Sequence, residues 1–275
     1  MKTDRNIIVA PNGARPGTSD HPAVPVTVNT LIDELALCAH AGAAMAHIHV
    51  RDSEQKHSLD PALNKEWLAE VRSALDNKLV IQLTTEAVGR YSPAQQMALL
   101  RATLPEATSI ALREIMPDEG SVDAASLFLH EVSEQRIFIQ YILYGAHDVI
   151  RYRQLISQGK IPSAGHHLLL VLGRYNESFI AQPAELDPML SALTGSETPW
   201  AACAFGPYAF QCLQSANLLG GDIRIGFENG LTDQSGKIAS NNAQLVSQIG
   251  NSVINTGFSL NSATDLRRKI HKSFK

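Results

Sequence analysis

The chain of 275 residues is 44% hydrophobic and 18% charged, an ordinary globular composition that fits one barrel-sized domain over residues 1–275. Its 23 basic and 27 acidic residues give a formal net charge of -4, without a basic cluster that would mark a nucleic-acid surface. No apolar run has the length of a signal peptide or membrane span, and the three cysteines lack C-x-x-C spacing, so we expect a cytoplasmic protein that acts on small molecules.

The first predicted elements form one β-α-β unit. A strand at residues 6–10 enters a loop rich in turn formers, residues 11–17, that is longer than a simple connection requires. Thr27 is a plausible N-cap for the helix that follows, and Gly42 would end that helix. A second strand is predicted at residues 46–52.

The second strand carries polar groups on one face only. Because successive side chains of a strand point to opposite faces, His47, His49 and Arg51 share one face and the alternating apolar residues share the other. Two imidazoles two residues apart can hold one metal ion if their face opens onto a cavity. The alternative is a pair of core histidines that form hydrogen bonds with their neighbours.

The alternation of strands and helices continues along the whole chain. Further strands are predicted at residues 79–83, 109–112, 137–143, 167–172, 201–205 and 223–227. Further helices are predicted at residues 67–75, from 93, at 124–134, 146–158, 186–193, 208–219 and 241–255, and a short extra one from about 262. Eight strands that alternate with helices, without linkers or repeats, favour an α/β fold of the closed (β/α)₈ TIM-barrel type over an open doubly wound sheet.

The eighth strand, residues 223–227, shows the same one-sided polarity as the second. Arg224 and Glu228 share its polar face. In a TIM barrel alternate strands contribute to common interior layers and active sites lie at the C-terminal mouth, so these residues can meet His47 and His49. Two histidines and one carboxylate suit catalytic zinc and, less well, iron(II). The alternative for Arg224 and Glu228 is a buried ion pair that braces the barrel mouth.

Several motifs together resemble one known family. His-Ile-His-Val-Arg-Asp at residues 47–52, Gly-Gly-Asp-Ile-Arg-Ile-Gly-Phe-Glu-Asn at 220–229, Asn-Gly-Ala at 12–14 and Gly-Lys-Ile-Ala-Ser-Asn at 236–241 are similar, in order and spacing, to the β-keto acid cleavage enzymes. The resemblance covers nearly the whole chain. It implies a zinc-bearing barrel that forms homo-oligomers, commonly homotetramers, and converts a β-keto acid and acetyl-CoA into acetoacetate and a new acyl-CoA.

The resemblance also implies roles for individual residues. By position, His47, His49 and Glu228 are the ligands of one zinc ion per chain, and Arg224 is the catalytic arginine. Thr84 matches a hydroxyl residue that helps to hold the carboxylate of the keto acid, and Thr85 and Asn12 are further candidates for substrate binding. In the implied mechanism zinc polarises the keto oxygen, and the carbanion formed next to it attacks the thioester.

The chain departs from the family pattern at several positions. The family usually has Asp directly after the zinc-ligating Glu, acting with the arginine in proton abstraction, whereas this chain has Asn229, which cannot be a base. Glu86 and Ala87 replace a Gly-Gly pair, and Glu114 lies where the family has groups that hold the carboxylate. Glu86 and Glu114 are therefore candidates for a replacement base, for a binder of a cationic group, or for solvated loop acids. Ala14 replaces the acid that receives a substrate amino group, which disfavours aminohexanoate.

Two other functions remain open. A His-x-His strand on this fold also marks metal-dependent hydrolases of the amidohydrolase-like type, which need further ligands after later strands. Here His147 falls in a helix, and His166 and His167 lie before or at the start of the sixth strand, so this hypothesis is the weaker one. The second is a zinc-binding barrel that has lost catalysis, which Asn229 and Glu86 would both permit.

Overall fold

The computed structural model describes residues 4–174 and 180–275. Its parallel strands close into a barrel in chain order, and β1 completes the ring by pairing with both β2 and β8. The strands are β1 (Ile7–Val9), β2 (Met45–Ile48), β3 (Val80–Thr84), β4 (Ala107–Ala111), β5 (Phe138–Leu143), β6 (His166–Leu172), β7 (Trp200–Ala204) and β8 (Asp222–Ile225). The predicted (β/α)₈ barrel is confirmed.

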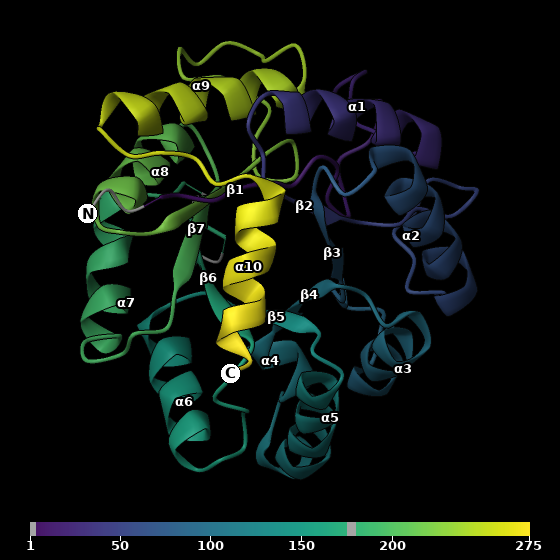
Figure 1. Ribbon diagram of the computed structural model, residues 1–275, viewed down its shortest axis with the longest axis vertical. Helices are drawn as coiled ribbons and strands as arrows, with labels where there is room; N and C mark the ends of the chain where they lie inside the picture. The colour runs from purple at the N-terminus through teal and green to yellow at the C-terminus, as the bar shows by residue number, and fades with distance from the viewer. Residues whose placement is uncertain (1–3, 175–179) are drawn as a thin grey trace.

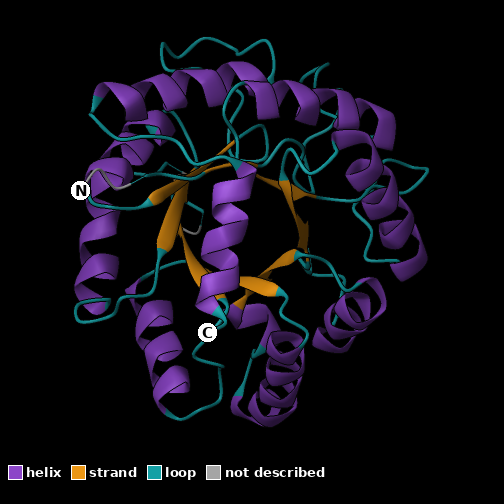
Figure 2. Ribbon diagram, viewed as in Figure 1, coloured by secondary structure: helices purple, strands orange, loops and turns teal. Residues whose placement is uncertain are grey.

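An outer ring of helices surrounds the strands (Figure 2). Its members are α1 (Val28–His40), α2 (Pro61–Leu75), α3 (Pro93–Thr103), α5 (Val122–Glu134), α6 (Ala146–Ser157), α7 (Leu186–Ala192), α8 (Ala209–Leu218) and α9 (Asn242–Asn255). The predicted N-cap Thr27 is confirmed, because its side chain accepts a hydrogen bond from the Thr30 amide, and the side chain of Ser92 caps α3 in the same way by accepting one from the Gln95 amide. Across the described ranges no helix is long and apolar enough to cross a membrane.

The two faces of the strands build two separate apolar clusters, as the alternation predicts. Ile48 and its outward-facing counterparts pack against the helices. Met45, Val80 and Phe138 belong to a second cluster inside the barrel. Since both faces are buried, the strands are apolar almost throughout, and polar residues on the inner face stand out as candidates for function.

The extra helix α10 (Ala263–Ser273) closes one end of the barrel. The helix was predicted to begin near residue 262; Ser262 caps it, and Leu266 and Ile270 belong to the interior cluster. Arg267 anchors the helix through a 2.6 Å contact with Glu106 and a hydrogen bond to the Leu79 carbonyl. Figure 1 shows α10 in yellow, lying across the ring of strands. The carboxyl ends of the strands, where active sites form in this fold, therefore lie at the opposite, open end.

Several predicted strand boundaries were wrong. Strand β2 ends at Ile48, so His49 lies just beyond it, because Asn12 rather than a neighbouring strand bonds to the His49 backbone. Strand β4 ends at Ala111, and the short helix α4 (Leu112–Ile115) starts immediately, so Glu114 is a helical residue. The 3₁₀ turns η1 (Glu119–Ser121) and η2 (Pro183–Glu185) were not predicted.

Strand β8 also ends earlier than predicted, at Ile225 rather than residue 227. Gly226 has φ +147°, and a Cβ atom there would lie 2.3 Å from the Ala10 carbonyl oxygen, so only glycine permits this close approach to β1. The chain then turns, with the Asn229 amide bonded to the Gly226 carbonyl, and the turn brings Glu228 over the open end of the barrel.

Candidate metal centre and active site

Three predicted ligand residues converge at the open end of the barrel. The Nε2 atoms of His47 and His49 are 3.0 Å apart, and each lies 3.3 Å from Oε2 of Glu228. Both histidines are buried, and the Glu228 side chain is 13% exposed. Within residues 4–174 and 180–275 this is the one group of three such side chains with ligand atoms close enough to hold a metal ion.

The donor set fits a divalent metal better than it fits a hydrogen-bond network. Oε2 of Glu228 has no hydrogen-bond partner among the described residues, so three atoms with free electron pairs face one another. A single proton between the imidazoles would leave the carboxylate oxygen unsatisfied. Donor atoms of a tetrahedral zinc site, with bonds of about 2.0 to 2.2 Å, are separated by about 3.3 to 3.6 Å, close to the separations seen here.

Local contacts explain how segments near the start of the sequence meet the turn after β8. The Asn12 side chain accepts a hydrogen bond from the His49 amide and donates one to the His49 carbonyl, which fixes His49 beyond the end of β2. The Glu228 amide donates to the Ala10 carbonyl at the end of β1. Between them, a Cβ atom at Gly13 would lie 2.6 Å from Cγ of Glu228, and its φ is +59°, so glycine lets the loop cross the carboxylate.

Glu228 serves two partners with its two oxygens. Oε1 accepts a 2.5 Å hydrogen bond from Nη2 of Arg224, while Oε2 faces the histidines. Burial alone would raise the pKa of Glu228, but the charge of Arg224 outweighs it and holds the pKa well below its usual range. Burial and the charge of Arg224 lower the pKa of His47, which keeps this imidazole neutral, as a metal ligand must be.

A cavity of about 230 Å³ opens beside these residues. Its lining residues are Ala14, Arg15, Pro16, His47, His49, Thr84, Glu86, Ile142, Tyr144, Val171, Arg174, Phe205, Arg224 and Glu228. The structure thus places six of the predicted site residues on one cavity, which also has an apolar side and two further arginines.

Glu86 lies in this cavity, close to the candidate metal centre. Its Oε1 forms a 3.0 Å ion pair with Arg15, and its Oε2 lies 3.8 Å from Nδ1 of His49. The side chain is 22% exposed. Glu86 therefore places a carboxylate on the cavity wall, beside the candidate metal centre.

Glu114 does not line the cavity. Its carboxylate accepts hydrogen bonds from the Ala87 amide and from the Gln96 side chain, both at 2.9 Å. Burial raises its pKa. Glu114 thus binds the loop that follows β3 and does not face the cavity.

Three more of the predicted residues lie outside the cavity lining. Thr85 donates its hydroxyl to the Ser109 carbonyl. Asn12 is buried, and its side chain donates to the carbonyls of Pro25 and His49. Asn229 is 7% exposed, its side-chain amide has no hydrogen-bond partner among the described residues, and it borders a separate hollow of about 30 Å³. Of the predicted carboxylate-binding groups, only Thr84 reaches the cavity.

Some residues of the site were not predicted. Oε1 of Gln82, an acceptor, lies 2.8 Å from Nδ1 of His47. It shares the inward parity of Thr84 on β3 and pairs in register with His47, so the alternation of β3 carried a signal. Arg15 and Arg174 come from loops whose paths the sequence does not reveal.

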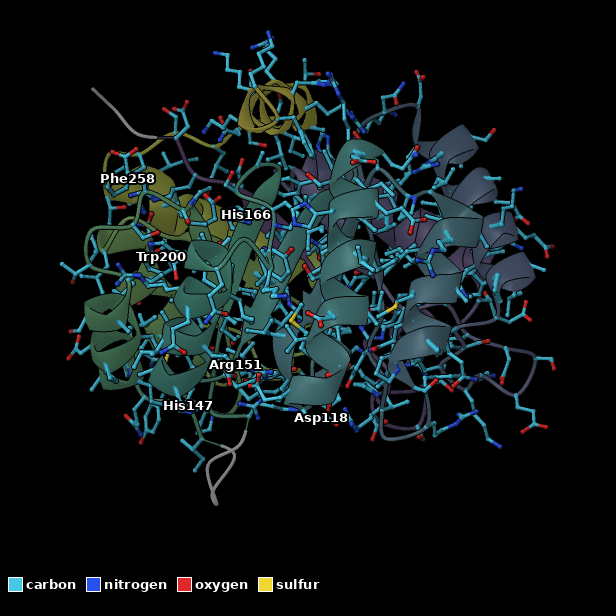
Figure 3. All side chains as sticks on the ribbon, turned by 90° about the horizontal axis from the view of Figure 1, so that it is seen from below. Asp118, His147, Arg151, His166, Trp200 and Phe258 are labelled. Atoms are coloured by element: carbon cyan, nitrogen blue, oxygen red, sulfur yellow. The ribbon has the colours of Figure 1, made fainter. Side chains whose placement is uncertain are left out.

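The geometry disfavours the amidohydrolase-like hypothesis. The cavity lining includes no histidine beyond His47 and His49, and no lysine. His147 is the second residue of α6 and does not line the cavity, and His166 and His167 open β6 at its amino-terminal end. Figure 3 shows His147 at the end of the molecule opposite α10, with His166 nearer to α10.

Comparisons with known proteins point to one family. The family model described as beta-keto acid cleavage enzyme matches residues 6–271. A 3-oxoadipate:acetyl-CoA acetyltransferase of Cupriavidus necator is 25% identical over 88% of this chain and 86% of its own. A 3,5-dioxohexanoate:acetyl-CoA acetone transferase of Paraburkholderia graminis is 26% identical over 96% of this chain and 94% of its own.

A solved structure supports the fold. The binary complex of ObcA with oxaloacetate superposes with a TM-score of 0.75 at 17% identity, covering 91% of this chain and 67% of that one. At this identity the likeness concerns the barrel alone.

Proposed function

Because the chain belongs to the family of beta-keto acid cleavage enzymes, we propose that it condenses a β-keto acid with acetyl-CoA to give acetoacetate and a new acyl-CoA. The carbon chain of the keto acid is cut next to its ketone, the two carbons carrying the carboxylate join the acetyl group, and the remaining acyl group is transferred to CoA. No redox cofactor is needed for this exchange.

The observation that carries the proposal is the meeting of His47, His49 and Glu228 with Arg224 on one cavity. When bound there, zinc supplies a Lewis acid for the keto oxygen. Nη2 of Arg224 is held by Glu228, whereas its Nε and Nη1 have no hydrogen-bond partner among the described residues. The N–H groups of these two nitrogens are fixed donors for negative charge that develops on the substrate.

We propose Glu86 as the base that removes the α-proton, in place of the Asp that the family has after Glu228. It is an acid on the cavity wall, and Arg15 holds its Oε1 in position. Asn229 cannot accept a proton, and the Glu114 carboxylate accepts a hydrogen bond from the Ala87 amide outside the cavity. The proton passes from the carbon between ketone and carboxylate to Glu86, and the carbanion attacks the thioester while Thr84 helps to hold the carboxylate.

The cavity favours a substrate with a second anionic group. Arg15 is neutralised by Glu86, but Arg174 has no carboxylate partner in the described part of the chain and stacks over the Phe205 ring at 5.2 Å. Position 14 is an alanine, so it offers no carboxylate for a cationic group of the substrate. We therefore propose a β-keto dicarboxylate, the class to which the 3-oxoadipate of the Cupriavidus relative belongs.

The proposal is tested by metal analysis together with turnover. We expect about one zinc per chain in the purified protein and very little in His49→Ala, whose barrel should remain folded by circular dichroism. Acetoacetate release from acetyl-CoA is then compared between 3-oxoadipate and 3-oxohexanoate, which has the same length but one carboxylate fewer. Arg174→Gln should raise KM for the dicarboxylate alone. Absence of acetoacetate with every keto acid would favour the zinc-binding barrel without catalysis.

A further inference from the structure

A continuous line of buried polar side chains runs through the interior of the barrel. Nδ1 of His47 lies 2.8 Å from Oε1 of Gln82, and Nε2 of Gln82 donates to Oε1 of Gln140 at 3.3 Å. Nε2 of Gln140 lies 3.1 Å from Nδ1 of His167, and Nε2 of His167 lies 3.3 Å from Oδ2 of Asp222. All five residues are at most 9% exposed.

The line starts at the candidate metal centre and ends near the closed end of the barrel. Asp222 is the first residue of β8, and its carboxylate also accepts hydrogen bonds from the backbone and side-chain N–H groups of Asn6. His167 is the second residue of β6. These are the amino-terminal ends of the strands, on the side that α10 covers.

The chemistry of Asp222 sets the direction of every hydrogen bond in this line. A carboxylate only accepts, so the proton of neutral His167 sits on Nε2 and its Nδ1 is an acceptor. Gln140 must then turn its NH₂ group to His167 and its oxygen to Gln82. Gln82 in turn offers its oxygen to His47, so that Nδ1 of His47 carries the proton and Nε2 is free.

We propose that Gln82, Gln140, His167 and Asp222 are positioning residues that determine the tautomer of His47. The far carboxylate, acting through three side chains, keeps Nε2 of His47 unprotonated and available to the metal. The inference rests on the metal centre of the proposed function but not on the reaction or the keto acid. A metal-ligating histidine commonly donates its other N–H to one carbonyl or carboxylate, and here that acceptor is the end of an oriented line.

For a neutral His167 the opposite direction is unfavourable. With the amides reversed, a neutral His167 would turn an unprotonated Nε2 toward the Asp222 carboxylate, and two acceptors would face each other inside the barrel. Such an unsatisfied pair is unfavourable where water cannot reach. A neutral amide in place of Asp222 removes this restriction, because it can donate to His167.

The experiment reads the tautomer directly, by ¹⁵N NMR of the imidazole nitrogens in the full chain after zinc has been removed, with circular dichroism to verify the fold. In the parent protein we expect Nδ1 of His47 protonated and Nε2 unprotonated. Asp222→Asn should reverse the line and move the His47 proton to Nε2. Zinc affinity, measured by competition with a chelator, should fall about 10- to 100-fold, the range for loss of such a supporting group.

A matched pair of variants at His167 separates direction from packing. A glutamine can still donate to Asp222 and accept from Gln140, so His167→Gln should keep the parental tautomer and zinc affinity. His167→Leu cannot, and should give a mixture of His47 tautomers with weaker zinc binding. These variants also decide the question if Asp222→Asn does not fold.

Parental His47 tautomers in both Asp222→Asn and His167→Leu would overturn the proposal. The proposed function has a separate failure: a protein whose His47 tautomer responds as expected, but which releases no acetoacetate, would retain the positioning line and lose the assigned reaction.

Discussion

At the scale of single residues, the position of Arg224 is compatible with both roles that the sequence presented as alternatives. It forms the buried ion pair with Glu228, and its Nε and Nη1 have no hydrogen-bond partner among the described residues. Burial by itself lowers the pKa of Arg224, but Glu228 outweighs it and raises the pKa, so the guanidinium remains charged. The bracing role and the catalytic role are compatible because a guanidinium has five donors.

Replacing Arg224 by Lys should therefore damage catalysis more than structure. The ammonium can keep the contact with Glu228 but cannot reproduce the two further donors of the planar group. We expect kcat to fall by about 10² to 10³, the loss typical of one donor to a developing oxyanion, with zinc content unchanged. Arg101→Lys, in the exposed ion pair with Glu131, is the control. A rate near the parental one would assign Arg224 to bracing alone.

Glu86 is tested by exchange of the substrate's α-proton with deuterium, which isolates proton abstraction from the later steps. Glu86→Gln should slow the exchange by about 10² to 10⁴, the usual contribution of a general base. Glu114→Gln, the matched control, should leave exchange nearly unchanged, because Glu114 bonds to the Ala87 amide away from the cavity. If neither variant slows exchange and Asn229→Asp alone creates it, the natural chain has no base and the non-catalytic hypothesis becomes the better one.

At the scale of elements, Arg51, which follows β2, is an anchor of the loop between β1 and α1. Arg51 donates to the carbonyls of Gly13 and Pro16 at 2.5 and 2.8 Å. On the pattern of the sequence, Arg51 shares a face with His47 and His49, but its side chain serves the loop instead of the metal centre. The loop in turn carries Arg15 to the cavity, so loop position and cavity shape are linked.

The helix α10 gives a prediction that separates stability from function. Ile270 is 7% exposed and packs into the closed end of the barrel, so Ile270→Ala should reduce the free energy of unfolding by about 2 to 4 kcal/mol. Zinc affinity should not change, because the metal centre lies at the other end. Denaturant titration measures the first and chelator competition the second. Exposed Leu127→Ala is the control, and weaker zinc binding in Ile270→Ala would show that the two ends are coupled.

At the scale of the whole molecule, buried histidines should make the fold sensitive to acid. Burial, together with His167, lowers the pKa of His166 to about 4. In the unfolded chain its pKa is about 6.5, so the unfolded state binds more protons between these values. Stability should therefore fall as the pH drops from about 6.5 to about 4, and His166 accounts for up to about 3 kcal/mol of this loss.

The variant His166→Phe checks this contribution. Denaturant midpoints measured between pH 4 and pH 7 should show a shallower decline than in the parent, while His271→Gln, at an exposed position, should leave the decline unchanged. Tyr152, the hydrogen-bond partner of His166, also bonds to Thr198 and so is not left unsatisfied by the change. An unaltered slope would mean that His166 is already protonated in the folded protein.

The assembly of the molecule stays a prediction. The family resemblance implies a homotetramer or another homo-oligomer, and sedimentation of the zinc-loaded protein measures it.

The barrel and the grouping of His47, His49 and Glu228 follow from patterns in the sequence. The alternation of the predicted strands grouped His47 with His49 and Arg224 with Glu228, although His49 lies just beyond β2 and Glu228 lies in the turn after β8. Closure of eight parallel strands then brings β8 and β2 to either side of β1, so the meeting of these side chains follows from the element order.

The positions of the other site residues depend on tertiary contacts. Thr84 and Thr85 are adjacent hydroxyl residues, yet one lines the cavity and the other bonds to the Ser109 carbonyl. Glu86 and Glu114 follow neighbouring strands, but α4 begins directly after β4. The Glu114 carboxylate therefore binds the Ala87 amide and does not reach the cavity. The position of a side chain beyond a strand end depends on the path of its loop, and that path is set by hydrogen bonds to distant segments, which no local periodicity encodes.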